Sequence, residues 1–180
     1  ISTAFGRLSG SGKVAMGGQE SDLRVTVEVN DLAPLAPIIH RPMTGTAKVE
    51  SLIHSSDFLQ GMTASLTGKL NGLSFGDMVI DKLLGPQVSV AGNLAWSTNN
   101  EGTIRDLTIE SAVGTLIGGL SITQDSHDLE GHYRLRVPRL ADLSDIAKVS
   151  LAGQLDMEGD IGGTLPDPSL SGQISSPALA

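Results

Sequence analysis

The sequence contains no cysteine, which excludes a disulfide framework, a zinc site with thiolate ligands and a thiol nucleophile. Aromatic residues make up only 3% of the 180 residues, so the hydrophobic content of 39% is almost entirely aliphatic. Long apolar runs are also missing. The best uncharged stretch, 111–124, is interrupted by glycines and hydroxyl side chains, and we therefore expect no membrane-spanning helix.

Basic residues are scarce relative to acidic ones. The sequence has 12 Lys and Arg residues and 20 Asp and Glu residues, which gives a net charge of −8. A surface of that sign repels phosphate backbones. We therefore exclude nucleic acid as a partner. A charged fraction of 18% with a mean hydropathy of +0.08 is not typical of a disordered chain. The chain starts at Ile1, and we expect it to be part of a longer protein.

Glycine is abundant, with 22 residues, or about 12% against a usual 7% or so. Several segments alternate apolar and polar residues with a period of two: 23–29, 88–96 and, as the longest, 149–161. This pattern predicts antiparallel strands with one solvated face. Short helical turns are predicted near 32–39, where Pro34 and Pro37 limit the helix, and near 139–147, where apolar residues recur every three positions.

The chain repeats itself at an offset of 108 residues. Val29, Leu32, Leu35 and Ile38 recur as Val137, Leu140, Leu143 and Ile146, and Gly45 recurs as Gly153. We therefore divide the chain into a first repeat, 1–108, and a second, incomplete repeat, 109–180, within one continuous sheet. Roughly 15 strands spaced about 4.8 Å apart would form a sheet about 70 Å long.

The fold class that follows is all-β: an elongated, mainly antiparallel sheet. No long helices are predicted to cover its aliphatic face, so the sheet must curl on itself or close against a second layer. Glycines would relieve crowding where the sheet bends. We expect a curled sheet to line a hydrophobic groove with side chains from the alternating segments: Val25, Val27, Val88, Val90, Leu94, Leu151, Leu155 and Met157.

Three segments resemble one known family. They are DLAPLAPII (31–39) ahead of Gly45, LLGPQVSVAGNL (83–94) and LAGQLDMEGDIGGTLPDPSLSGQI (151–174). Together they are similar to the TamB family, the inner-membrane-anchored subunit of the bacterial translocation and assembly module, which belongs with the AsmA-like repeating β-groove proteins. The last segment looks like entry into the C-terminal domain of that family.

The resemblance implies a taco-shaped sheet with a hydrophobic groove, located in the periplasm. It implies transport of phospholipid between the inner and outer membranes and support for outer-membrane protein assembly, including autotransporters. Its implied partners are phospholipid acyl chains, an outer-membrane β-barrel protein and unfolded outer-membrane proteins. We expect the family's N-terminal membrane anchor to lie outside this sequence. No catalytic group, cofactor or metal is implied, and we expect the chain not to be an enzyme.

Four short motifs suggest other chemistry. A G-x-S-x-G pattern at 72–76 fits a hydrolase only within an α/β sheet, and a glycine-flanked strand end is the better interpretation. Gly10–Lys13 lacks the first Gly and the final Ser or Thr of a phosphate loop. Asp156, Glu158 and Asp160 lack the Gly and Glu of a calcium loop and fit a solvated strand face that discourages edge association. The histidines (His40, His54, His127 and His132, with Asp125 beside His127) show no convincing metal-ligand spacing.

Two alternatives to a lipid groove remain at this stage. One is a chaperone-like module whose sheet edge or groove binds the β-strands of outer-membrane proteins. The other is a structural β-solenoid whose own side chains fill a closed interior. An open apolar face would favour the groove, and a closed interior would favour the solenoid.

Overall fold

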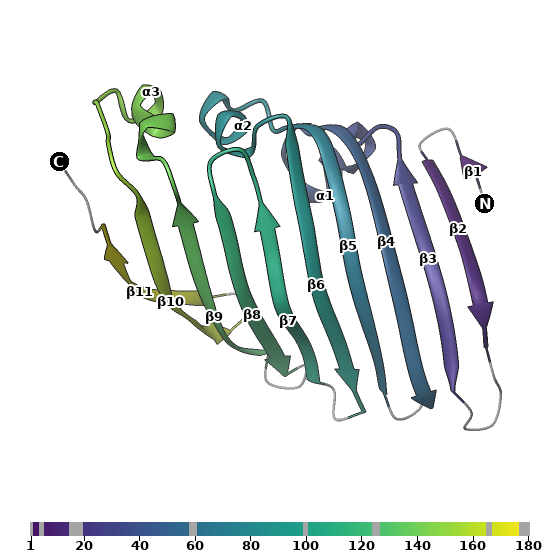
Figure 1. The fold of residues 1–180 in the computed structure, drawn as a ribbon. Coiled ribbons are helices and arrows are strands. Elements are labelled where there is room, and N and C mark those ends of the chain that lie inside the picture. The colour runs from purple at the N-terminus through teal and green to yellow at the C-terminus, as the bar shows by residue number, and fades with distance from the viewer. Residues whose placement is uncertain are drawn as a thin grey trace.

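The computed structural model describes residues 2–3, 6–14, 20–57, 61–98, 101–123, 127–164 and 167–176. They form one 11-stranded sheet whose spatial order is the order of the sequence, with every neighbouring pair antiparallel (Figure 1). The prediction of an all-β, mainly antiparallel sheet is confirmed, and the question that the sequence left open, whether the sheet closes, is answered: within the described residues it does not. Its strands are β1 (Ser2–Thr3), β2 (Gly6–Lys13), β3 (Ser21–Val29), β4 (Thr44–Asp57), β5 (Gly61–Ser74), β6 (Gln87–Ser97), β7 (Glu101–Glu110), β8 (Thr115–Thr123), β9 (Asp128–Val137), β10 (Leu155–Thr164) and β11 (Asp167–Ser175).

Short helical segments lie along one end of the sheet (Figure 1). They are η1 (Ala33–Leu35), α1 (Ala36–Ile39), α2 (Met78–Leu84), η2 (Leu140–Leu143) and α3 (Ser144–Ala147). The helical turns predicted near 32–39 and 139–147 are confirmed. The additional helix α2 begins after Asp77, whose carboxylate accepts the N–H groups of Val79 and Ile80, and ends at Gly85.

The 108-residue repeat is visible in the backbone. The segment η1–α1 between β3 and β4 corresponds to η2–α3 between β9 and β10, and α1 maps onto α3 residue for residue. The Leu32 N–H donates to the Gly45 carbonyl and the Leu140 N–H to the Gly153 carbonyl, both at 2.9 Å. His40 and Lys148, which end the two helical segments, share a left-handed conformation with φ of 54° and 56°.

The repeating unit therefore runs from β2 to β7, and β8 begins the second unit. The division predicted at 108/109 falls inside β7, two residues before that strand ends. The expected number of about 15 strands is too high, because several strands are long: β4 and β5 have 14 residues each. Eleven strands span about 48 Å in the direction of the hydrogen bonds.

The best-packed part of the sheet is its helical end. Leu32, Leu73 and Val88 are buried there and pack against partly buried side chains of the surrounding strands and loops, among them Leu84 of α2. Val137 and Leu140 occupy the corresponding place in the second unit. Among the described residues, these five are the buried hydrophobic side chains.

The molecule exposes far more surface than a compact protein of its mass. Its accessible surface is 11738 Å², whereas a folded monomer of 18.6 kDa exposes about 8200 Å². The excess is what a single sheet without a covering layer leaves open to solvent. In the described part of the chain, no helix is both long and apolar enough to cross a membrane.

Candidate functional site: the apolar face of the sheet

One face of the sheet is apolar from β2 to β11. Directly opposed residues in neighbouring strands point to the same face, so the strand registers identify its members. We call the following line, which crosses ten strands, the aliphatic row: Leu8, Val27, Val49, Gly68, Val90, Ile109, Leu116, Leu135, Met157 and Ile174.

Three further rows continue the face toward the end of the sheet opposite the helices. The glycine row contains Gly10, Val25, Ser51, Leu66, Gly92, Leu107, Gly118, Tyr133, Gly159 and Gly172. The outer row contains Gly12, Leu23, Ile53, Ala64, Leu94, Ile104, Leu120, Gly131, Ile161 and Leu170. The tip row contains Met62, Trp96, Gly102, Ile122 and Leu129.

Seven of the eight predicted lining residues lie on this face. Val27, Val90 and Met157 are in the aliphatic row, Val25 is in the glycine row, and Leu94 is in the outer row. Val88 and Leu155 lie beside the helices, in line with Leu70 and Val137 respectively. Val88 is only 3% exposed, so it belongs to the core and is not accessible to a ligand.

Leu151 lies outside the sheet, because the strand predicted over 149–161 begins only at Leu155. The preceding segment is a loop that belongs to the helical end. The Leu151 N–H donates to Ser144 Oγ at 3.0 Å, and the Leu140 N–H holds the Gly153 carbonyl. Gly153 has a φ of +90°, which removes this residue from a regular strand. The prediction of a strand over 149–154 is therefore wrong.

None of the predicted lining residues lies in β7 or β8, so sequence reasoning missed the part of the face that these two strands contribute. Asp106 is an extra residue in β7, where the pairings with β6 and β8 both shift register, and it has a φ of +51°. The bulge changes the parity of the strand, so Ile104 and Leu107 lie on the same face although they are three residues apart. A break in alternation next to an Asp was the available signal.

A hollow of about 360 Å³ deepens the apolar face at its tip. Its surface is almost wholly apolar and comes from β5, β6, β7 and β8. Several of its side chains are well exposed: Leu94 is 39%, Trp96 41% and Met62 42% exposed. Trp96 is therefore a surface residue of this face.

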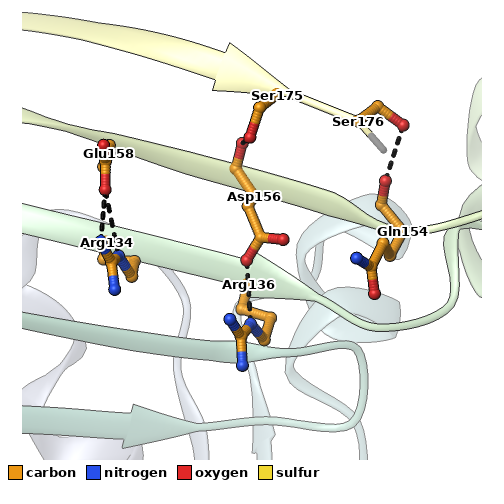
Figure 2. Close-up of polar contacts among 7 residues, drawn as sticks. All are labelled: Arg134, Arg136, Gln154, Asp156, Glu158, Ser175 and Ser176. Carbon is orange, nitrogen blue, oxygen red and sulfur yellow. Dashed lines mark hydrogen bonds and ion pairs between the residues drawn. The ribbon is translucent and has the colours of Figure 1, made fainter. Parts of the chain in front are cut away.

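The opposite face is polar and carries cross-strand ion pairs. Arg134 of β9 pairs with Glu158 of β10, and Arg136 Nε lies 2.8 Å from Asp156 Oδ1 (Figure 2). The solvated strand face predicted for the acidic residues of β10 is thus present. The expected protection of an edge is wrong, because β11 pairs along β10 and β10 is an interior strand.

The other motifs are structural in the described residues. Ser74 ends β5, and its hydroxyl donates to Asp81 Oδ2 at 2.6 Å. That bond and the N–H of Phe75 hold the pKa of the Asp81 carboxyl below its usual value. Gly10–Lys13 lies within strand β2, not in a loop. His54 pairs with Asp22 at 2.9 Å, no cluster of metal-ligating side chains occurs in the described part of the chain, and Asp125 lies outside it.

The strands in the described ranges do not close into a tube, because the sheet order runs from β1 to β11 without a closing pair. The interior filled by its own side chains that a β-solenoid requires is therefore absent there. Comparison with protein-family models, curated proteins and solved structures found no match. The similarity to the TamB family accordingly stands on the sequence motifs alone.

Proposed function

We propose that this chain is a non-enzymatic segment of a lipid conduit, whose apolar face carries phospholipid acyl chains. The observation that carries the proposal is the continuity of the face: aliphatic side chains and glycines follow one another across ten strands, and most of them are only partly buried. As the resemblance to the TamB family implies, the segment would act in the periplasm, between the inner and outer membranes, together with an outer-membrane β-barrel partner.

Energetics favours a mobile hydrocarbon ligand on such a surface. Each methylene group removed from water contributes about 0.8 kcal/mol, wherever along the face it is buried. The ion pairs between neighbouring strands lie on the opposite face and would not interrupt the path. Because the aliphatic row is continuous, an acyl chain could exchange one set of aliphatic contacts for the next without passing a charged side chain.

Photo-crosslinking in cells tests the proposal. We expect a photoreactive residue at Val25 or Ile161, on the apolar face and away from the tip hollow, to capture phospholipid. The neighbouring positions Thr26 and Asp160 lie on the polar face of the same strands and are the matched controls, for which we expect no capture. Absence of phospholipid at Val25 and Ile161, together with absence of lipid from the purified chain by native mass spectrometry, would contradict the proposal.

A second candidate function is binding of outer-membrane protein strands at a sheet edge. All residues of β11 are exposed, including Leu170 at 71% and Ile174 at 68%, and in the described residues β11 has a neighbour on one side only. An extended segment could add to that edge by β-augmentation. Crosslinks from β11 to unfolded barrel proteins, lost when proline replaces a β11 residue whose N–H points away from β10, would support this function.

A further inference from the structure

The tip hollow differs from the rest of the apolar face in shape and in chemistry. Its principal side chains are Met62, Leu94, Trp96, Ile104, Leu120 and Ile122. A Cβ atom on Gly102 would lie 2.7 Å from Trp96 Cζ3, so the indole ring lies against the bare backbone of the next strand. The ring therefore lies close to the sheet. Because Gly102 has no side chain, the space above the ring stays open and forms the hollow.

The almost wholly apolar lining favours a hydrocarbon as the occupant. A single peptide strand would place amide and carbonyl groups against a surface that offers almost no hydrogen-bonding partner, at about 1–3 kcal/mol for each unsatisfied group. A hydrocarbon chain brings no such group, and it gains free energy with each methylene it buries. An ester or a phosphate would also lack a partner here, so the polar end of a lipid must lie outside the hollow.

We propose that the tip hollow binds the methyl-terminal part of one phospholipid acyl chain, with Trp96 as its floor. This inference rests on the proposed function and adds to it a fixed binding position and an orientation. The remaining rows form a continuous surface along which a chain can move. The hollow is instead a concave site in which the end of the chain is held while the ester and head group extend beyond it.

The chain reports on this site by itself, because Trp96 is its single tryptophan. Brominated acyl chains quench indole fluorescence at short range. We expect a phospholipid brominated near the methyl end of its acyl chain to quench Trp96 strongly, and one brominated next to the ester to quench it weakly. Equal quenching by the two lipids, or quenching by brominated fatty acid but not by brominated phospholipid, would overturn the assignment. This comparison needs no variant of the protein.

A filled hollow provides the second arm. Ala64 lines the hollow, and Ala64→Phe should displace about two methylene groups of the ligand. This loss corresponds to a roughly tenfold weaker affinity for the brominated phospholipid, measured by quenching of Trp96. Ser65→Phe places the same ring on the polar face of β5 and should leave the affinity unchanged. Equal affinity in the two variants would contradict the proposal.

Native mass spectrometry of the unmodified chain separates the two hypotheses. Bound phospholipid without quenching of Trp96 would overturn the tip-hollow assignment and leave the conduit proposal standing. Absence of bound phospholipid, with unquenched Trp96, would contradict both.

Discussion

At the scale of single residues, the glycines on the apolar face differ in whether the structure has room for a side chain at their positions. A Cβ atom on Gly159 would overlap the Ser171 carbonyl and lie 2.6 Å from the Gly172 Cα, because β10 and β11 approach too closely for a side chain. The side chain of Tyr133 extends over this region, and its hydroxyl donates to the Ser171 carbonyl at 3.4 Å. The aromatic ring thus covers a place where two glycines leave backbone bare.

Gly159→Ala should therefore destabilise the protein by about 2 kcal/mol or more, as expected for forced overpacking. Gly10 occupies the same row at the other side of the sheet, but the nearest atom to a Cβ there is the Arg24 carbonyl oxygen at 3.6 Å. Gly10→Ala should be tolerated and should raise the stability by about 0.4–1 kcal/mol, because alanine restricts the unfolded chain. Denaturant unfolding of the two variants checks the prediction, and similar losses of stability in both would contradict it.

At the scale of strands and helices, the β7 bulge keeps the apolar face continuous. Asp106 adopts the left-handed conformation and accepts a hydrogen bond from Asn93 Nδ2 at 3.3 Å. Without the additional residue, Ile104 and Leu107 would point to opposite faces of the sheet. The bulge thus brings side chains that are an odd number of residues apart onto the same face of the sheet.

Asp106→Gly should keep the stability or raise it slightly, since glycine adopts a positive φ without strain. Asp106→Val should cost about 1–2 kcal/mol, because a β-branched residue is strained there. Deletion of Asp106 should be far more damaging than either substitution, because one side of β7 would turn its apolar residues to the polar face. Thermal unfolding of the three variants measures the order, and a deletion no worse than Asp106→Val would contradict the role of the bulge.

Sequence patterns predicted some elements well and others not at all. Strands β3 and β6 alternate without interruption and were found, whereas the bulge concealed the face of β7. Helix α2 is too short for a clear periodicity, although Asp77 before it and Gly85 after it are its boundary signals. The opposite error occurred at 149–154. Apolar and polar residues alternate there, but the segment is a loop, because the Gly153 carbonyl accepts a hydrogen bond from the backbone of η2. Which faces coincide across the sheet depends on registers between strands, and a periodicity within one strand does not contain that information.

At the scale of the whole molecule, stability is concentrated near the helices. Leu32, Leu73 and Val88 pack there, and Lys82 of α2 pairs with Asp145 of α3 at 2.6 Å, which lowers the pKa of that carboxyl. Strand β11, in contrast, is exposed along its whole length. Local opening should therefore require much less free energy at β11 than in the middle of the sheet.

Native-state hydrogen exchange checks this gradient. We expect the slowest amide exchange in β4, β5 and β6, each of which is paired on both sides and contributes to the packed end. Among strands β6 to β11, we expect the amides of β11 to exchange fastest. Uniform protection from β4 to β11 would mean that the sheet opens only as a whole, and would contradict a localised core.

The repeating unit contains an even number of strands, β2 to β7, and this number has a geometric consequence. After six antiparallel strands the chain again points in its starting direction, so each new unit places its helical segment at the same margin of the sheet. A unit with an odd number would place successive helical segments at alternating margins. Each additional copy would lengthen the sheet by about 29 Å, with every helical segment at the same margin. The length of such a protein could thus change by whole repeats during evolution without any change in its cross-section.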